Sequence, residues 1–97
     1  MKAVFIAYNQ SITFEVQEIL RELNIRGYTQ WIDVKGSGSE NGEPHEGTHT
    51  WPEKNNAHLT MVEDDKVEQL LDLVKKLDKK SEQQGLRAFV WDIEKSI

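Results

Sequence analysis

Four short apolar runs and two longer amphipathic segments alternate along the chain. The runs over residues 2–8, 28–34, 57–62 and 86–93 are rich in β-branched and aromatic residues, which is typical of strands. Residues 12–26 and 65–80 carry apolar side chains every three or four positions, which predicts helices, and Gly27 is expected to end the first of them. The order βαββαβ predicts one α+β domain over residues 1–97, a ferredoxin-like sandwich.

The first and last predicted strands are apolar on both sides, although two helices can cover only one face of a four-stranded sheet. The alternating positions that form the second apolar set are Phe5 in the first strand and Phe89, Trp91 and Ile93 in the last. An apolar surface that no helix of the chain can reach needs a partner. We expect that partner to be another copy of the same chain.

The longest segment without a periodic pattern covers residues 36–56, between the second and third predicted strands. It contains glycines and both prolines of the chain, and Trp51 is its only large apolar side chain. Loops of this length in compact domains usually have a function. Trp51 is a candidate partner contact, because tryptophan is enriched among interface hot spots. Packing of Trp51 against the body of the protein is the alternative.

All three histidines lie between positions 45 and 58. Imidazole and carboxylate groups, here with Glu43 and Glu46 nearby, are good ligands for zinc, copper or nickel. This clustering predicts a divalent transition metal held by His45 and His49, with His58 as a third ligand if it faces a channel between copies. The alternatives are a solvated loop whose histidines are simply exposed, and a hydrogen-bonded structural role for His58.

Composition excludes several classes of protein. A net charge of −5 is not that of a nucleic-acid-binding surface, and no apolar run approaches the 18 residues of a membrane span. The absence of cysteine excludes disulfides, cysteine-ligated zinc and thiol catalysis. No serine lies in a hydrolase-like context. We therefore expect a soluble, cytoplasmic protein that is not an enzyme.

Several segments resemble the PII signal-transduction proteins. Ile25–Thr29 and Val34–Gly38 are similar to the second strand of that family and to the start of its long loop. Val67–Leu71, which follows two aspartates, resembles the beginning of the second PII helix, and Arg87–Glu94 resembles the last core strand. The likeness runs through nearly all of the chain and agrees with the predicted order of elements.

The resemblance implies a homotrimer whose sheets face a central channel, and it implies that residues 36–56 are the T-loop with which PII proteins contact a transporter or an enzyme. PII proteins are regulators that bind adenine nucleotides in the clefts between subunits. Thr29, Gly36, Gly38 and Arg87 match nucleotide-contacting positions of the family. The glycine-rich turn that holds phosphates in PII proteins is a departure, since residues 80–86 contain one glycine.

A second function of another class stays open. The CutA divalent-cation tolerance proteins share the trimeric architecture, and the loop histidines suit a metal-binding accessory protein, for example one that serves a metal-efflux system. The two functions differ in what they bind. A nucleotide sensor should depend on Arg87, whereas a metal-binding protein should depend on His45 and His49.

Overall fold

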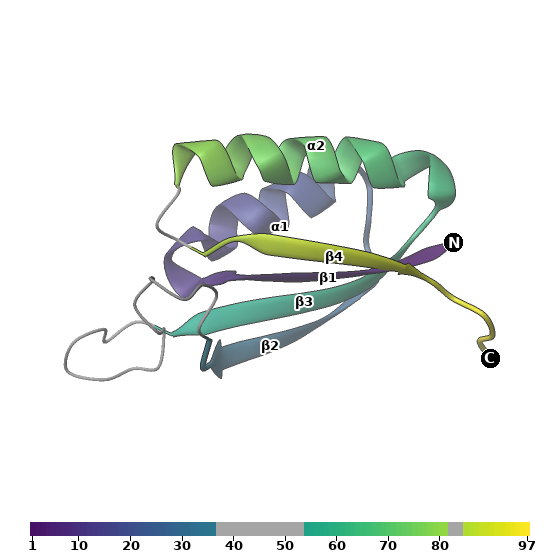
Figure 1. Ribbon diagram of the computed structural model, residues 1–97, viewed down its shortest axis with the longest axis horizontal. Coiled ribbons are helices and arrows are strands. Elements are labelled where there is room, and N and C mark those ends of the chain that lie inside the picture. The colour runs from purple at the N-terminus through teal and green to yellow at the C-terminus, as the bar shows by residue number, and fades with distance from the viewer. Residues whose placement is uncertain (37–53, 82–84) are drawn as a thin grey trace.

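The computed structural model describes residues 1–36, 54–81 and 85–97. The elements follow in the order β1 (Lys2–Asn9), a short 3-10 helix η1 (Gln10–Ile12), α1 (Thr13–Glu22), β2 (Tyr28–Val34), β3 (Asn55–Val62), α2 (Asp64–Lys80) and β4 (Arg87–Asp92). One antiparallel sheet has the strand order β2-β3-β1-β4, and both helices lie on the same side of it (Figure 1). The predicted α+β ferredoxin-like sandwich is confirmed.

The core lies between the helices and the sheet. Strand β1 runs through the middle of the sheet and points every second side chain at the helices, so Val4, Ile6 and Tyr8 are fully buried. The helices meet them with side chains spaced three or four positions apart, as the sequence predicts. These helix residues are Val16 and Leu20 of α1 and Val67, Leu70 and Val74 of α2.

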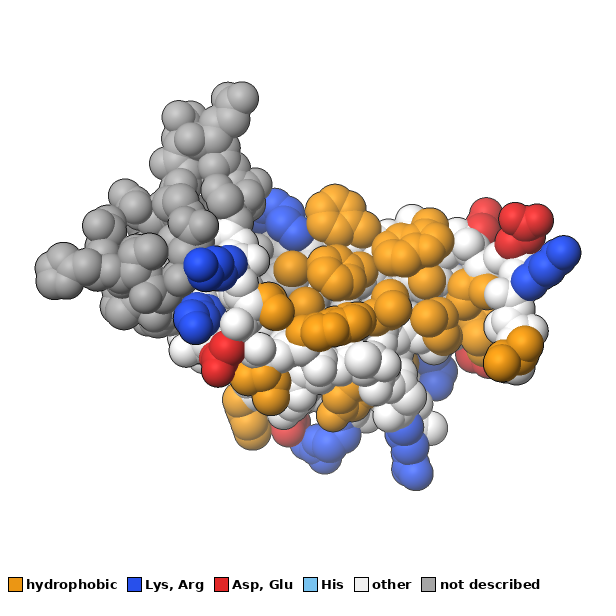
Figure 2. Space-filling view, turned by 90° about the horizontal axis from the view of Figure 1, so that it is seen from below, with side chains coloured by type: hydrophobic (Ala, Val, Ile, Leu, Met, Phe, Trp, Pro, Cys, Tyr) orange, Lys and Arg blue, Asp and Glu red, His pale blue; other side chains and the backbone are white. Residues whose placement is uncertain are grey.

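The opposite face of the sheet carries a second set of apolar side chains. Phe5 lies opposite Leu59 of β3 and Phe89 of β4, on the side that the helices do not cover. Figure 2 shows this face, with hydrophobic side chains gathered across its centre. We call it the open face; its large side chains are Phe89, Trp91, Met61 and Trp31, which are 57%, 50%, 48% and 43% exposed, and the partly buried Phe5 and Leu59. The predicted second apolar face is confirmed.

Helix α1 ends differently from the prediction. Asn24, and not Gly27, adopts the left-handed conformation that closes the helix, with φ of 57°. Its backbone N–H donates to the carbonyl of Arg21 (3.0 Å), and the N–H of Ile25 donates to the carbonyl of Leu20 (2.8 Å). This pair of hydrogen bonds is a Schellman motif, which tolerates asparagine in place of glycine.

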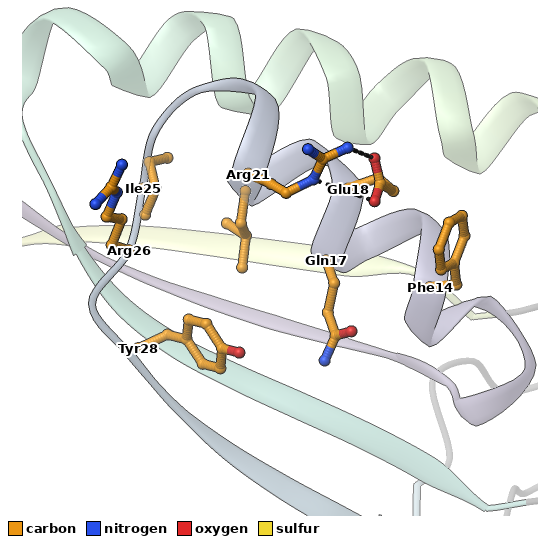
Figure 3. Close-up of a pocket in the computed structure, with 8 residues that line it drawn as sticks. Phe14, Gln17, Glu18, Arg21, Ile25, Arg26 and Tyr28 are labelled. Atoms are coloured by element: carbon orange, nitrogen blue, oxygen red, sulfur yellow. Dashed lines mark hydrogen bonds and ion pairs between the residues drawn. The ribbon is translucent and has the colours of Figure 1, made fainter.

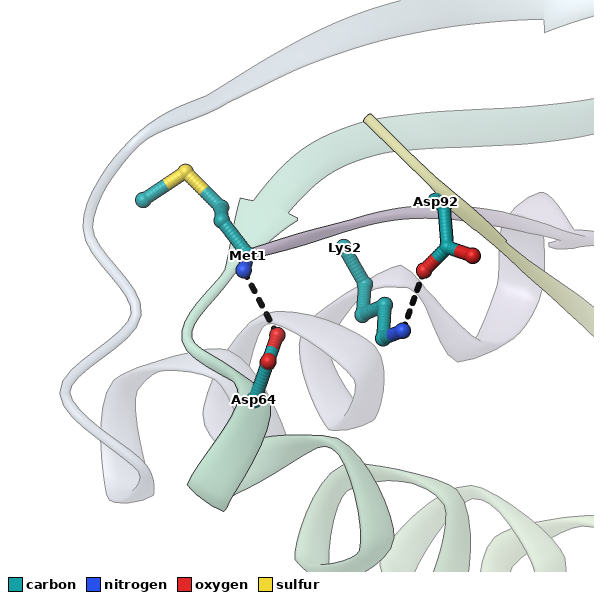
Figure 4. A network of polar contacts seen from close by, with 4 residues as sticks. All are labelled: Met1, Lys2, Asp64 and Asp92. Carbon is teal, nitrogen blue, oxygen red and sulfur yellow. Dashed lines mark hydrogen bonds and ion pairs between the residues drawn. The ribbon is translucent and has the colours of Figure 1, made fainter. Parts of the chain in front are cut away.

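Two exposed ion pairs lie at the end of the sheet where the chain begins (Figure 4). The α-amino group of Met1 lies 2.6 Å from the carboxylate of Asp64, in the first turn of α2, and this contact lowers the pKa of Asp64. Lys2 pairs with Asp92 of β4. Exposed pairs of this kind add little stability, so the core and not these contacts holds α2 against the sheet.

Candidate functional site

The candidate site lies at the end of the sheet where β2 ends and β3 begins, which we call the loop end. Strand pairing places Asn55 of β3 opposite both Val34 of β2 and Asn9 of β1. Arg87, the first residue of β4, lies opposite Ala7 of β1 at the same end. The last residues of β1 and β2 and the first residues of β3 and β4 are therefore close to one level of the sheet.

Strand β3 begins two residues earlier than predicted, so the segment 36–56 includes strand residues at its end. Asn55 and Asn56 are buried. The side-chain carbonyl of Asn56 accepts from the backbone N–H of Asp33 (3.0 Å), and its amide donates to the hydroxyl of Thr13 (2.8 Å). Asp33 has φ of 59° and lies where the pairing of β2 with β3 becomes irregular. Asn56 thus fastens the end of β2 to the start of α1.

Gly36 packs closely against the start of β3. A Cβ atom at this position would lie 2.2 Å from the side-chain nitrogen of Asn55, which is far inside van der Waals contact. Directly after β1, the backbone N–H of Gln10 in η1 donates to the carbonyl of Lys54 (2.9 Å). The chain on both sides of the loop is therefore held by contacts to the body, and Gly36 fits because it has no side chain.

His58 lies in the core on the covered face. It is opposite Ile6 in the strand pairing and is fully buried, so the alternative in which it faces a channel between copies is wrong. A hydrogen bond of 2.9 Å joins its Nδ1 atom and the hydroxyl of Tyr8, and the edge contact with Tyr28 has a ring separation of 4.9 Å. Burial lowers the pKa of His58 and raises the pKa of Tyr8. The hydrogen-bonded structural role is the one that the structure shows.

The predicted nucleotide-contacting residues do not converge within one chain. Thr29 is exposed near the beginning of β2, whereas Gly36 follows the other end of that strand. Arg87 lies on β4, at the opposite edge of the sheet. Gly38 lies outside the described residues. A site that includes both Gly36 and Arg87 therefore cannot be formed by one copy as it stands here.

Arg87 makes one hydrogen bond and one ion pair among the described residues. Its Nη1 atom donates to the carbonyl of Leu86 (2.6 Å) and lies 3.6 Å from the carboxylate of Asp78 in the last turns of α2. Sequence reasoning missed Asp78. The available signal was a carboxylate among the lysines that end this helix, at the end where the helix dipole disfavours negative charge.

A groove of about 360 Å³ lies between α1 and the beginning of β2 (Figure 3). Its arginines have partners: Arg21 pairs with Glu18, and the Nε atom of Arg26 donates to the side chain of Asn24. The sequence did not indicate this groove. Its lining residues are Phe14, Gln17, Glu18, Leu20, Arg21, Ile25, Arg26 and Tyr28.

The loop residues with predicted chemistry lie outside the described part of the chain. These are the metal candidates His45 and His49 and the partner-contact candidate Trp51. Within residues 1–36, 54–81 and 85–97, no three histidine, aspartate or glutamate side chains are grouped so that they could hold a metal ion. Metal binding by the loop stays a prediction. In the same described ranges, no helix is long and apolar enough to cross a membrane.

Two helices on one face of a four-stranded antiparallel sheet form a ferredoxin-like sandwich, and a long connection between β2 and β3 is the feature that PII-like proteins add to it. The family model described as nitrogen regulatory protein P-II matches residues 1–97, so the chain belongs to the P-II family. The resemblance found in the sequence is therefore confirmed. Members of this family are regulatory proteins rather than enzymes and are generally trimers that bind partner proteins.

Solved structures of similar fold include CPII, a PII-like protein from Thiomonas intermedia K12. CPII bound to ADP and bicarbonate matches with a TM-score of 0.76 and 22% identity, over 95% of this chain and 84% of that one. CPII bound to ADP, AMP and bicarbonate matches with a TM-score of 0.74 and 20% identity, over 95% of this chain and 88% of that one. The apo form of CPII matches with a TM-score of 0.67 and 17% identity, over 95% of this chain and 87% of that one. A comparison with curated proteins finds no match.

Proposed function

We propose that this chain is a PII-like regulatory protein that senses an adenine nucleotide between the subunits of a homotrimer and acts through residues 36–56 on a transporter or an enzyme. One observation carries the proposal. Gly36 and Arg87, which match nucleotide-contacting positions of the family, lie at the same end of the sheet but at its two opposite edges.

The distance between these edges favours a site shared by two copies. Strands β3 and β1 lie between β2 and β4, so the edges are about 14 Å apart at a strand spacing of about 4.8 Å. If the β4 edge of one copy lies beside the β2 edge of the next, Gly36 and Arg87 face one cleft. Assembly through the open face is favourable, because it removes the exposed aromatic side chains from water.

A nucleotide in such a cleft would touch the start of the loop directly. Gly36 packs on Asn55, and the neighbouring Asn56 ties β2 to Thr13 of α1. A ligand that contacts Gly36 therefore acts where the backbone leaves the rigid sheet. This arrangement suits a protein in which ligand binding changes the loop and the loop contacts the partner.

The choice of ligands to test follows from charge and from the CPII structures. Arg87 is half exposed and can donate to a phosphate oxygen. The CPII structures of similar fold hold ADP, AMP and bicarbonate, so AMP, ADP and ATP are the first nucleotides to titrate, each with and without bicarbonate.

Calorimetric titration of the wild type, Arg87→Gln and Arg26→Gln tests the proposal. Arg26 is the matched control, because it is also an exposed arginine but lies before β2, away from the loop end. We expect the wild type and Arg26→Gln to bind at least one nucleotide with equal affinity, and Arg87→Gln to bind about tenfold more weakly, the loss typical of a charged hydrogen bond. Absence of nucleotide binding, or equal binding by Arg87→Gln, would contradict the proposal.

A further inference from the structure

The side chain of Arg87 starts on the open face of the sheet, but its guanidinium group lies near a helix on the covered face. Alternation along β4 puts Arg87 on the same side as Phe89, which belongs to the open face. Its Nη1 atom nevertheless lies 3.6 Å from the carboxylate of Asp78, on a helix that covers the other face. Arg87 is the first residue of β4, an edge strand of the described sheet, and from this position its guanidinium reaches Asp78 on the helix side.

The contact between Arg87 and Asp78 is held by charge. The two side chains are 52% and 39% exposed, and the Oδ1 atom of Asp78 is buried without a hydrogen-bond partner among the described residues. A separation of 3.6 Å is too long for a strong charged hydrogen bond. The hydrogen-bonding groups of the Arg87 guanidinium are therefore only partly used, and a phosphate oxygen can engage them without breaking a short bond to Asp78.

The position of Asp78 makes its negative charge matter for an anionic ligand. It lies in the last turns of α2, where the partial negative charge of the helix dipole adds to that of the carboxylate. Lys79 and Lys80 follow it on the same helix and are exposed, so their charges are screened by solvent. Among the described residues, Asp78 is the carboxylate that lies within 4 Å of the Arg87 guanidinium, and the pair together is neutral.

We propose that Asp78 determines which nucleotides the site prefers, because it cancels the charge of Arg87 and removes the advantage of the more highly charged phosphates. This inference rests on the proposed nucleotide site and adds a specificity residue to it. Coulomb attraction grows with the charge of the ligand. A neutral Asp78–Arg87 pair gives ATP no charge-based advantage over AMP and ADP, whereas an Arg87 without Asp78 beside it would favour ATP.

The substitution Asp78→Asn tests the inference, because it keeps the shape of the side chain and removes its charge. We expect a gain in affinity that rises with ligand charge, about twofold for AMP and about fivefold for ATP at about 0.1 M salt, the range expected for ligand charges of about −2 and −4 at about 8 Å from the carboxylate in water. The gain should shrink at high salt. A merely structural role of Asp78 would change all three affinities by the same factor.

Asp72→Asn is the matched control, since Asp72 is exposed on the same helix and its substitution changes the net charge equally. We expect it to bind all three nucleotides like the wild type. A gain for Asp78→Asn that is equal for AMP, ADP and ATP, a loss of affinity, or the same gain in Asp72→Asn would overturn the inference while nucleotide binding stands. Absence of binding in both the wild type and Asp78→Asn would overturn the inference and the proposed function together.

Discussion

The two faces of the sheet have similar apolar sequences but very different surroundings. On the covered face, Val4 and Ile6 of β1 are fully buried beneath α1 and α2. On the open face, Phe89 and Trp91 of β4 are half exposed, although they alternate with half-buried residues of the same strand. Strand alternation therefore identifies which side chains share a face. Whether that face is buried depends on the helices and, for the open face, on a partner.

The polar side chains of the two faces differ as well. The covered face includes Tyr8, His58 and Thr60, all buried, and each makes a hydrogen bond; that of Thr60 goes to the carbonyl of Gly27 (2.5 Å). Buried polar groups need such partners, and Tyr8, Thr60 and the Nδ1 atom of His58 find theirs within the chain, whereas the Nε2 atom of His58 is buried without a partner among the described residues. The central part of the open face is formed by apolar side chains and gains stability only when another surface covers it.

The largest expected effect concerns assembly through the open face. Phe89→Asp places a carboxylate on this face beside Phe5, and burial of an unpaired charge strongly opposes association. We expect light scattering at micromolar concentration to give the mass of a trimer for the wild type and of a single chain for Phe89→Asp.

Phe14→Asp is the control for this prediction. Phe14 is 69% exposed on α1, on the other side of the sheet, and its substitution introduces the same charge. It should leave the mass unchanged. A wild type that is a stable single chain, or a trimer that survives Phe89→Asp, would show that the open face is not an interface between copies.

The next effect concerns the covered face and is a loss of stability. Leu70 of α2 is fully buried, so Leu70→Ala leaves a cavity and should lower the free energy of unfolding by about 2–5 kcal/mol. Ile32→Ala, at a residue that is 64% exposed, should lower it by less than about 0.5 kcal/mol. Urea unfolding at one fixed protein concentration measures both; equal losses would contradict the assigned core.

The pH dependence of stability should report His58. Burial holds the pKa of His58 below its ordinary value of 6.5, so the unfolded chain takes up a proton at a higher pH than the folded one. Stability due to neutral His58 is complete above about 6.5 and is lost as pH falls below that value, by at most about 1.4 kcal/mol per pH unit.

Unfolding measured between about pH 7.5 and about pH 5.5 tests this expectation. His58→Gln cannot titrate and should show a smaller decrease over this range than the wild type. His45→Gln, which removes a histidine of the loop, is the control and should keep the wild-type slope. An unchanged slope in His58→Gln would mean that the buried imidazole is not the group that titrates.

The smallest expected effect is metal binding by the loop. The comparison of the two faces narrows the candidate ligands to the loop histidines. Because the covered face buries His58 beside Tyr8, a metal site in the loop would have to do without it. Zinc calorimetry should show moderate affinity that is lost in the double variant His45→Ala/His49→Ala and unchanged in His58→Gln. Equal zinc binding by the wild type and the double variant would exclude the loop site.

The sequence by itself determined the order of elements, the apolar stripes of both helices and the existence of a second apolar face. These features are local, because helix and strand periods are set by neighbouring positions along the chain. Val16, Leu20, Leu70 and Val74 are buried as their spacing predicts. The family resemblance likewise rests on short segments read in their order along the chain.

Only the tertiary structure decided which face of β3 holds His58, where the loop ends and which residue faces Arg87. Asn56 has the composition of a loop residue, yet it is buried in β3 because Thr13, 43 positions away, accepts its amide hydrogen bond. Asp78 lies near Arg87 because α2 packs on the sheet beside β4. Such contacts join residues that no local period connects, so they arise only when the helices pack on the sheet.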